Sequence, residues 1–275
     1  MQQFEPMSIG QILDRTFRLY RQNFVRFVAI AAVVQVPIAI VMLALQRVLP
    51  QTAEEGASPR YVMVIGLAWA FIGAFFAVIS KGFGEAALLK SVSESYLGRS
   101  VTVSQAYRFI LPKLGAVVCA SILVFLVIVG GILLLVVPGI IFSLWFSLTM
   151  QAIVLENLKA TDGMSRSMLL VRGNLGKVFL VGLVVLLIAS IVNLLFWGAG
   201  SLAASYLPGH DPTGPMAVTQ LVSMVGEVLV MPISAAAMIL LYYDLRIRKE
   251  AFDLEMLAES LGSKWGPSDA AAPAR

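Results

Sequence analysis

The sequence predicts an all-α integral membrane protein with about six transmembrane helices, and two observations support this prediction. The 275 residues are 59% hydrophobic and only 13% charged, whereas soluble domains are about half apolar and about a quarter charged. The apolar residues also come in blocks of about twenty, the length that crosses a hydrocarbon core of roughly 30 Å. Each block must be helical, because an open strand would leave backbone groups unsatisfied in lipid.

The predicted spans follow one another along most of the chain. They lie at 24–45, 61–80, 114–137, 139–155, 178–198 and 217–242. Only Val137-Pro138-Gly139 separates the third from the fourth, so these two should form a tight hairpin in which one helix is kinked or fails to cross fully. The first apolar run begins near Phe24, after a charged amphipathic stretch, and is long enough to be a retained helix rather than a signal peptide. Residues 1–265 should form one polytopic membrane domain, and the small polar residues of 266–275 a disordered cytoplasmic tail.

The distribution of basic residues predicts the orientation. If the N-terminus is cytoplasmic, all of the 20 Lys and Arg residues except Arg47 and Arg60 lie on the cytoplasmic side. An excess of Lys and Arg near the span ends marks the cytoplasmic loops of membrane proteins. The chain is therefore predicted to lie in the cytoplasmic membrane with both termini inside.

A cytoplasmic segment of similar design precedes the first, third and fifth spans. The first, SIGQILDRTFRLYRQNF, begins with Ser8 and Gln11 at the spacing of a capping box and continues with apolar residues on one helical face. The second, TVSQAYRFILPKLG, repeats the box from Thr102. The third, TDGMSRSMLLVRGNLGK, has Thr161 as its expected cap, followed by Asp162, which suits the positive end of a helix.

These segments predict three units, each an interfacial amphipathic helix followed by a helical hairpin. The basic side of such a helix should face anionic lipid headgroups. The residues expected to contact headgroups are Arg15, Arg18, Arg21, Arg108, Lys113, Arg166 and Arg172. The first and third segments also share an Arg followed two places on by Asn, in Arg21-Gln22-Asn23 and Arg172-Gly173-Asn174. Chance similarity among amphipathic helices is the alternative, since Pro112 interrupts the second segment.

The same residues carry a family resemblance. SIGQILDRTFRLYRQNF looks like the N-terminus of bacterial proteins related to the membrane domain of glycerophosphoryl diester phosphodiesterases. VVPGIIFSLWFSLTMQAIVLENLKATDGMSRSMLLVRGN resembles the centre of that group, with Pro138-Gly139-Ile140, Glu156 and the stretch from Ser167 to Asn174. The resemblance covers most of residues 8–249. It implies a bacterial inner-membrane architecture without the separate, metal-binding catalytic domain of the fused enzymes, for which no cytoplasmic segment here is long enough.

Polar residues at membrane depth are the candidates for an intramembrane site. Glu227 lies about ten residues into the last span, where a free carboxylate is costly. It should be a neutral group bonded to a neighbouring helix, or a proton or ligand site that faces a wet cavity. Gln35, Gln151 and Asn193 lie in other spans, where such residues more often bond a neighbouring helix than a ligand.

Few other residues suggest chemistry. Lys81 and Glu85 are one helical turn apart and are expected to form an ion pair at the interface. One cysteine, Cys119, and one histidine, His210, do not provide the ligands that a metal site needs. No metal, cofactor or catalytic residue is predicted, and no nucleic-acid partner, because the positive-inside bias accounts for the basic faces.

Three classes of function are consistent with these features. We favour a non-catalytic module that organises membrane lipids or partner proteins, with another membrane protein or a second copy as possible partners. The alternative is a transporter of a lipid or small solute, proton-coupled through Glu227, because transporters often arise from internal repeats. An intramembrane enzyme is the third class, and it lacks a convincing set of catalytic groups. The sequence identifies neither a substrate nor a reaction.

Overall fold

The computed structural model describes residues 6–48, 58–96, 101–207 and 213–264, and its regular structure in these ranges is helical, which confirms the predicted all-α class. The elements are α1 (Ile9–Gln22), α2 (Phe24–Val48), α3 (Pro59–Ser80), the π-helix η1 (Lys81–Glu85), α4 (Ala86–Tyr96), α5 (Val103–Ile110), the 3-10 helix η2 (Leu111–Lys113), α6 (Leu114–Leu134), α7 (Val136–Trp145), α8 (Thr149–Glu156), α9 (Ala160–Val171), α10 (Leu175–Ser205) and α11 (Thr213–Lys264). The predicted tail, 266–275, lies outside the described residues.

The chain is a multi-pass membrane protein. Among the described residues, five helical stretches are long and apolar enough to cross a membrane: Phe24–Arg47, Val103–Leu134, Val136–Glu156, Leu175–Ser205 and Gly214–Glu250. A shorter apolar stretch in α3, Pro59–Gly73, overlaps the predicted second span, 61–80. The apolar pattern of the sequence therefore located these helices.

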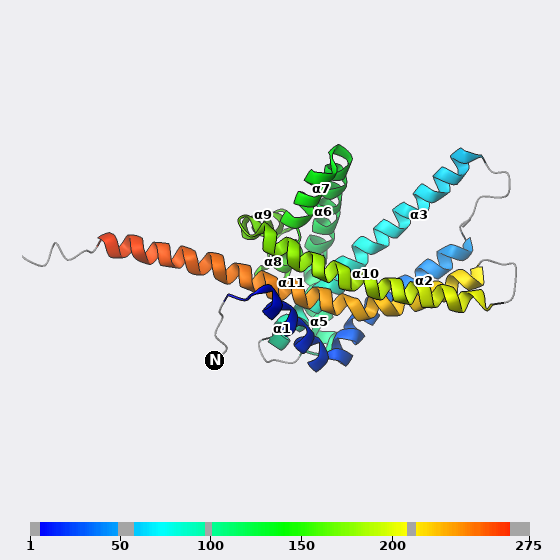
Figure 1. The fold of residues 1–275 in the computed structure, drawn as a ribbon, viewed down its shortest axis with the longest axis horizontal. Coiled ribbons are helices and arrows are strands. Elements are labelled where there is room, and N and C mark those ends of the chain that lie inside the picture. Colours follow the sequence, from blue (N-terminus) through cyan, green and yellow to red (C-terminus); the bar gives the residue numbers. More distant parts are fainter. Residues whose placement is uncertain (1–5, 49–57, 97–100, 208–212, 265–275) are drawn as a thin grey trace, which may run out of the picture.

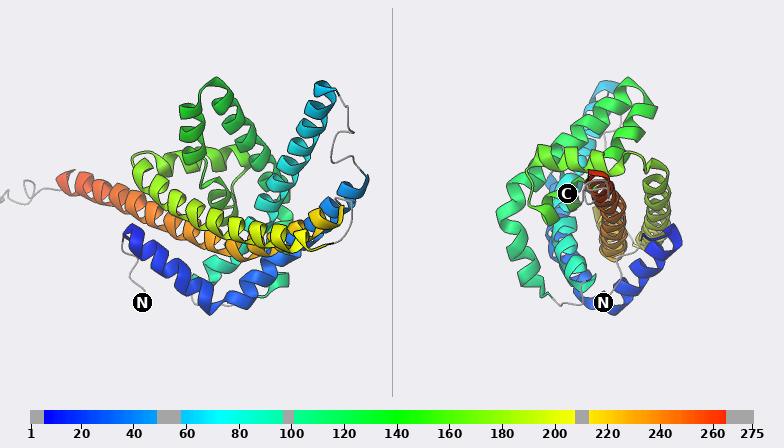
Figure 2. Two further views of the ribbon diagram at one scale, coloured as in Figure 1. Left: turned by 45° about the vertical axis from the view of Figure 1, so that its right-hand side comes forward. Right: turned by 90° about the vertical axis from the view of Figure 1, so that its left-hand side faces the viewer.

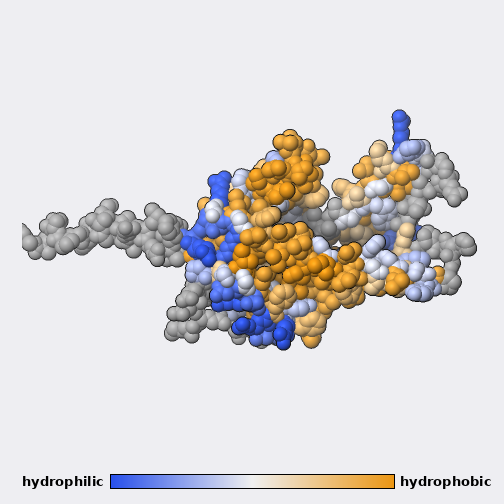
Figure 3. All heavy atoms as spheres, viewed as in Figure 1, coloured by the Kyte–Doolittle hydropathy of each residue, from blue (hydrophilic) through white to orange (hydrophobic). Residues whose placement is uncertain are grey.

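The membrane helices diverge from a common base (Figure 1). Three groups of helices point in different directions away from this base, as two further views confirm (Figure 2). They are the hairpin of α6 and α7, helix α3, and the group of α2, α10 and α11. The base consists of α1, α4, α5, α8 and α9 around the middle of α11, and its core includes the fully buried Leu88, Ile153, Leu170 and Leu240. Hydrophilic residues gather around the base, while the diverging helices present mostly apolar surface (Figure 3).

The predicted hairpin of spans three and four is present, but its turn falls earlier than predicted. Leu135, in extended conformation with φ −164° and ψ 142°, joins α6 to α7. Pro138 and Gly139 lie in the first turn of α7, where proline is tolerated because the first backbone N–H groups of a helix have no intrahelical partner. A Cβ on Gly139 would come within 2.9 Å of the backbone nitrogen of Ile132, so this glycine allows the two helices to pack closely.

The fourth predicted span is interrupted, as expected for one helix of this hairpin. Residues 146–148 separate α7 from α8. Ser167 of α9 bonds the backbone at this break: its Oγ accepts from the N–H of Leu148 at 3.1 Å and donates to the carbonyl of Trp145 at 2.7 Å. One hydroxyl thus replaces helical hydrogen bonds on both sides of the interruption, as backbone groups away from water require.

The three amphipathic segments are helical, and two start as predicted. Ser8 and Thr102 each form a complete capping box, at the start of α1 and α5 respectively. The predicted cap of the third segment, Thr161, is wrong: α9 begins at Ala160, after an N-cap at Lys159 whose backbone is extended. Thr161 is already inside the helix, and Asp162 lies in its first turn as expected.

Candidate functional site

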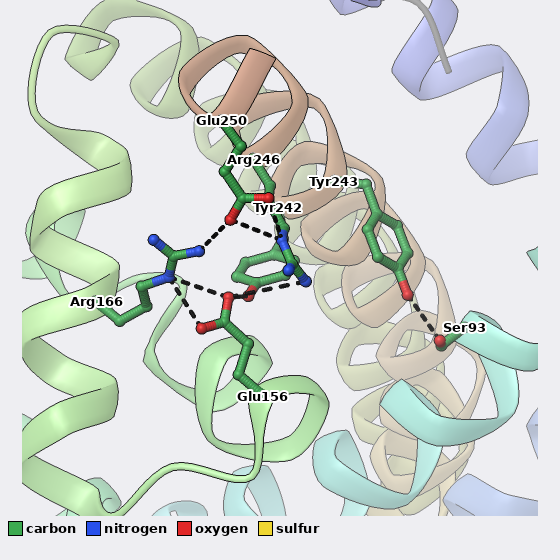
Figure 4. A network of polar contacts seen from close by, with 7 residues as sticks. All are labelled: Ser93, Glu156, Arg166, Tyr242, Tyr243, Arg246 and Glu250. Carbon is green, nitrogen blue, oxygen red and sulfur yellow. Dashed lines mark hydrogen bonds and ion pairs between the residues drawn. The ribbon is translucent and has the colours of Figure 1, made fainter. Parts of the chain in front are cut away.

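A group of charged and phenolic side chains joins three helices at the base, and we call it the Glu156 cluster (Figure 4). Its members are Glu156 at the end of α8, Arg166 of α9, and Tyr242, Arg246 and Glu250 of α11. The guanidinium of Arg166 donates from Nε to both Glu156 oxygens at 3.0 Å and from Nη2 to Glu250. The Tyr242 hydroxyl also donates to Glu156.

The charges of the Glu156 cluster balance. Arg246 donates from Nε to the two oxygens of Glu250 at 2.9 and 2.8 Å, so two guanidinium groups meet two carboxylates. Burial alone would lower the pKa of Arg166, but its hydrogen bonds to Glu250 and Glu156 outweigh burial and raise the pKa above the ordinary value. These bonds between residues of α8, α9 and α11 fix the three helices relative to one another. A pocket of about 480 Å³ opens beside Glu156 and Arg166.

A second group, the Asp244 cluster, joins the N-terminal segment to α10 and α11. The side chain of Asp244 is fully buried and accepts from the backbone N–H of Met7 at 2.6 Å, from Lys177, and from Nε of Arg248 at 3.0 Å. The carbonyl of Met7 accepts from Lys177 at 2.6 Å and from Arg248 at 3.1 Å. A buried carboxylate needs such partners, because desolvation of an unpaired charge costs several kcal/mol.

The basic residues predicted to face headgroups divide into two sets. Those that remain exposed are Arg18, Arg21, Arg108 and Arg172. Arg172 also contacts the protein, at Met168 Sδ and over the ring of Trp145. The other three bond residues of other elements: Arg15 donates to the Tyr96 hydroxyl at 3.1 Å, Lys113 donates to the carbonyl of Val154 at 2.8 Å, and Arg166 belongs to the Glu156 cluster.

Of the intramembrane polar candidates, two meet. Gln35 of α2 donates from Nε2 to Oε2 of Glu227 of α11 at 3.1 Å, which is one of the two outcomes expected for this carboxyl group. Gln151 is buried in α8, and Asn193 is half-buried on α10. The predicted ion pair of Lys81 with Glu85 cannot be placed, because the side chain of Lys81 lies outside the described residues.

Sequence reasoning did not single out the residues that hold the base together. Asp244, Tyr242, Glu250 and Lys177 were not among the candidates, although Asp244 with Arg248 and Arg246 with Glu250 have the i, i+4 spacing of helical ion pairs. That spacing in YYDLRIRKE was the available signal. It shows which charges pair along α11 but not that Met7 and Lys177 join them.

Comparison with known proteins places the chain in a family. Residues 7–245 match the family described as a domain of unknown function, DUF7847, and the chain belongs to this family. The match begins at Met7 and ends one residue after Asp244, so its limits coincide with the two sides of the Asp244 cluster. No curated protein and no solved structure matches the chain.

Proposed function

We propose that this member of the DUF7847 family is a non-catalytic membrane module whose base binds anionic lipid headgroups. The exposed arginines carry the proposal: Arg18 and Arg21 on α1, Arg108 on α5 and Arg172 after α9 all lie on amphipathic segments of the base. Each basic residue near an anionic membrane surface contributes about 1 kcal/mol to binding. Four such residues on the base would concentrate anionic lipid beside the protein.

The ion pairs of the acidic residues support a structural rather than a catalytic role for the base of the molecule. Glu156 and Glu250 are bonded to guanidinium groups, and Asp244 is bonded to two cations and a backbone N–H. A general acid or base instead needs a proton that can be exchanged with a substrate. The proposal therefore assigns these carboxylates to holding the base together.

The distribution of hydrophilic and basic residues supports an orientation of the protein in the membrane. Hydrophilic residues gather at the base (Figure 3). The base also holds Met7, whereas Arg60 lies at the end of α3 remote from η1 and α4. Under the positive-inside rule the base then faces the cytoplasm. We propose a bacterial inner membrane with both termini inside, and a relationship to the membrane domain of glycerophosphoryl diester phosphodiesterases, supported by the similar sequence segments at Pro138-Gly139-Ile140 and from Ser167 to Asn174.

Transport of a lipid or small solute is the second candidate function. The observation in its favour is the position of Glu227, which is exposed on the surface of α11 within a membrane helix and bonded to Gln35. A carboxyl group at that depth is costly unless it has a role. The bond to Gln35 also gives it a purely structural role, joining α2 to α11.

Lipid selection tests the first proposal. The protein is reconstituted in nanodiscs with phosphatidylglycerol and phosphatidylethanolamine, and the lipid retained on it is measured by native mass spectrometry. Charge reversal of Arg18, Arg21, Arg108 and Arg172 to Glu should abolish the enrichment of phosphatidylglycerol, while Arg60→Glu at the other end should preserve it. Equal enrichment in the fourfold variant and the unmodified protein would refute the proposal.

A further inference from the structure

A pocket of about 590 Å³ lies at the end of α11 remote from the base. It is formed by the last turns of α10, the first turns of α11, and Gln46 near the end of α2. Gln220 of this pocket and Asp244 of the base are separated by 24 residues of α11, about 36 Å of helix at 1.5 Å per residue. The pocket and the charged base therefore lie at opposite faces of the membrane.

The lining of this pocket combines uncharged polar side chains with apolar ones such as Leu207 and Met216. Serine, threonine and glutamine side chains contribute hydroxyl and amide groups, among them Ser201, Gln220 and Ser223. No Asp, Glu, Lys, Arg or His is among the described residues that line it. A charged ligand would lose its hydration here without gaining an opposite charge, which is unfavourable. A neutral ligand with several hydroxyl groups could replace its hydration by hydrogen bonds to the lining.

One hydroxyl group in the lining lacks a hydrogen-bond partner among the described residues. It is the Oγ of Ser223, which is buried. Buried polar atoms normally have a hydrogen-bond partner, and each buried atom without one lowers the stability of a protein by about 1–3 kcal/mol. A rotation of the Ser223 side chain toward the pocket that it lines would expose this hydroxyl to a ligand hydroxyl, which would supply the partner.

Trp197 adds an aromatic surface to the same lining. Its side chain is 57% exposed, so the indole borders the pocket without being packed into the protein core. An indole combines a flat apolar face with an N–H donor, and sugar rings likewise combine an apolar C–H face with hydroxyl groups. An aromatic side chain with a few hydrogen-bonding groups is the usual composition of a small-molecule site of this volume.

The two helices that form the wall are closely packed. A Cβ on Gly200 would come within 2.9 Å of the Cα of Thr219, and one on Gly226 within 3.0 Å of the ring of Phe196. These contacts hold α10 against α11 along the pocket. The backbone of this wall is therefore preformed, which reduces the entropic cost of binding a ligand.

We propose that this pocket binds an uncharged, hydroxyl-rich group, either the sugar headgroup of a glycolipid or a free sugar of the same kind. The site is independent of the proposed headgroup contacts of the base, because it lies at the other membrane face and involves none of the same residues. Loss of binding here would leave the enrichment of phosphatidylglycerol unchanged, so the two proposals can fail separately.

Binding of defined lipids tests the proposal. The full chain in phosphatidylcholine nanodiscs is titrated with monoglucosyl diacylglycerol, diacylglycerol, phosphatidylglycerol and methyl glucoside, and binding is measured by native mass spectrometry. Preference for the glucolipid over diacylglycerol supports the proposal with a lipid as the source of the sugar. Binding of methyl glucoside with similar affinity supports it with a free sugar as the source. Equal binding of glucolipid and diacylglycerol, or displacement of the glucolipid by phosphatidylglycerol, overturns it.

Substitutions locate the binding in the pocket. Ser223→Leu should fill the space and weaken glucolipid binding at least about tenfold, a change of about 1.4 kcal/mol. Ser190→Leu, which replaces an exposed hydroxyl on α10 outside the pocket, is the matched control and should bind normally. If Ser223→Leu does not fold, Trp197→Ala provides the same test, because this exposed side chain contributes little to packing. Full affinity in the folded pocket variant would overturn the proposal.

Discussion

Asn23 and Asn174 adopt nearly the same backbone conformation at equivalent places in the chain. Asn23 has φ −121° and ψ 21° between α1 and α2, and Asn174 has φ −126° and ψ 20° between α9 and α10. Each lies where an amphipathic helix passes into a membrane helix. The carbonyl of Asn23 accepts from the N–H of Phe27 at 3.0 Å, and that of Asn174 from Val178 at 3.1 Å. The first and third units therefore share a junction in three dimensions as well as in sequence.

The side chains of these two asparagines differ, which predicts unequal effects of substitution. Nδ2 of Asn23 donates to the carbonyl of Leu19 at 3.2 Å, and its Oδ1 accepts from Arg26 at 3.1 Å, whereas the side chain of Asn174 makes no capping hydrogen bond. Asn23→Ala should lower the free energy of unfolding by about 1 kcal/mol, and Asn174→Ala by less. Unfolding in mixed micelles measures both, and a larger loss for Asn174→Ala would contradict the assignment.

Ser167 should be more important than an ordinary helix serine. Ser167→Ala removes one hydroxyl but leaves both the N–H of Leu148 and the carbonyl of Trp145 without that partner. We expect a loss of about 1–3 kcal/mol of stability, the usual cost of unsatisfied buried groups. Ser143→Ala is a suitable control, since Ser143 is partly exposed and, among the residues that the structure describes, bonds within its own helix α7, to the carbonyl of Ile140. Similar stabilities for the two variants would show that the break between α7 and α8 does not depend on Ser167.

The Glu156 cluster predicts energetic coupling between α8 and α9. Glu156→Gln and Arg166→Met should each destabilise the protein, and the double variant should lose less than the sum of the two. The coupling should be about 1–2 kcal/mol, within the range found for residues of one ion-pair network. A double-mutant cycle measured by unfolding in micelles checks this value. Strict additivity would mean that the contact of Arg166 with Glu156 contributes nothing to the base.

The Asp244 cluster should be the most sensitive polar site in the protein. Asp244→Asn keeps the shape of the side chain but leaves Lys177 and Arg248 without their carboxylate. Breaking a buried ion pair on one side typically costs about 3–5 kcal/mol. Asp14→Asn, at an exposed carboxylate of α1, should cost below about 1 kcal/mol. Comparable stabilities of the two variants would be inconsistent with a central role for Asp244.

Substitution of Glu227 separates a structural role from proton transport. Glu227→Gln preserves a hydrogen bond to Gln35, so a structural carboxyl group should tolerate it, whereas Glu227→Leu should weaken the contact of α2 with α11 by about 1 kcal/mol. A proton-transferring group would instead lose its function in the Gln variant without loss of folded protein. The measurements are protein yield, thermal stability and complementation of a deletion strain. Full complementation by a stable Gln variant would exclude the proton-coupled transporter.

The features that could be predicted from the sequence are those that depend on neighbouring residues. Runs of apolar residues mark membrane helices because lipid imposes one length and one secondary structure, and the capping boxes at Ser8 and Thr102 join residues only three apart. The turn at Leu135 was misplaced because proline is compatible both with a loop and with the first turn of a helix. The contact of Met7 with Asp244 spans 237 positions, and no local pattern specifies it. The bond between Gln35 and Glu227 was only partly predictable, since depth indicated a partner without identifying which helix provides it.

The contact between Met7 and Asp244 also bears on how the protein is made. Synthesis and membrane insertion proceed from the N-terminus, so Met7 is complete long before Asp244 leaves the ribosome. Until α11 is inserted, the segment before α1 lacks its acceptor, and Lys177 lacks its carboxylate. A nascent chain that stops short of α11 therefore cannot close its base, however many of its earlier helices have entered the bilayer. Assembly of the base is therefore completed only by the last helix.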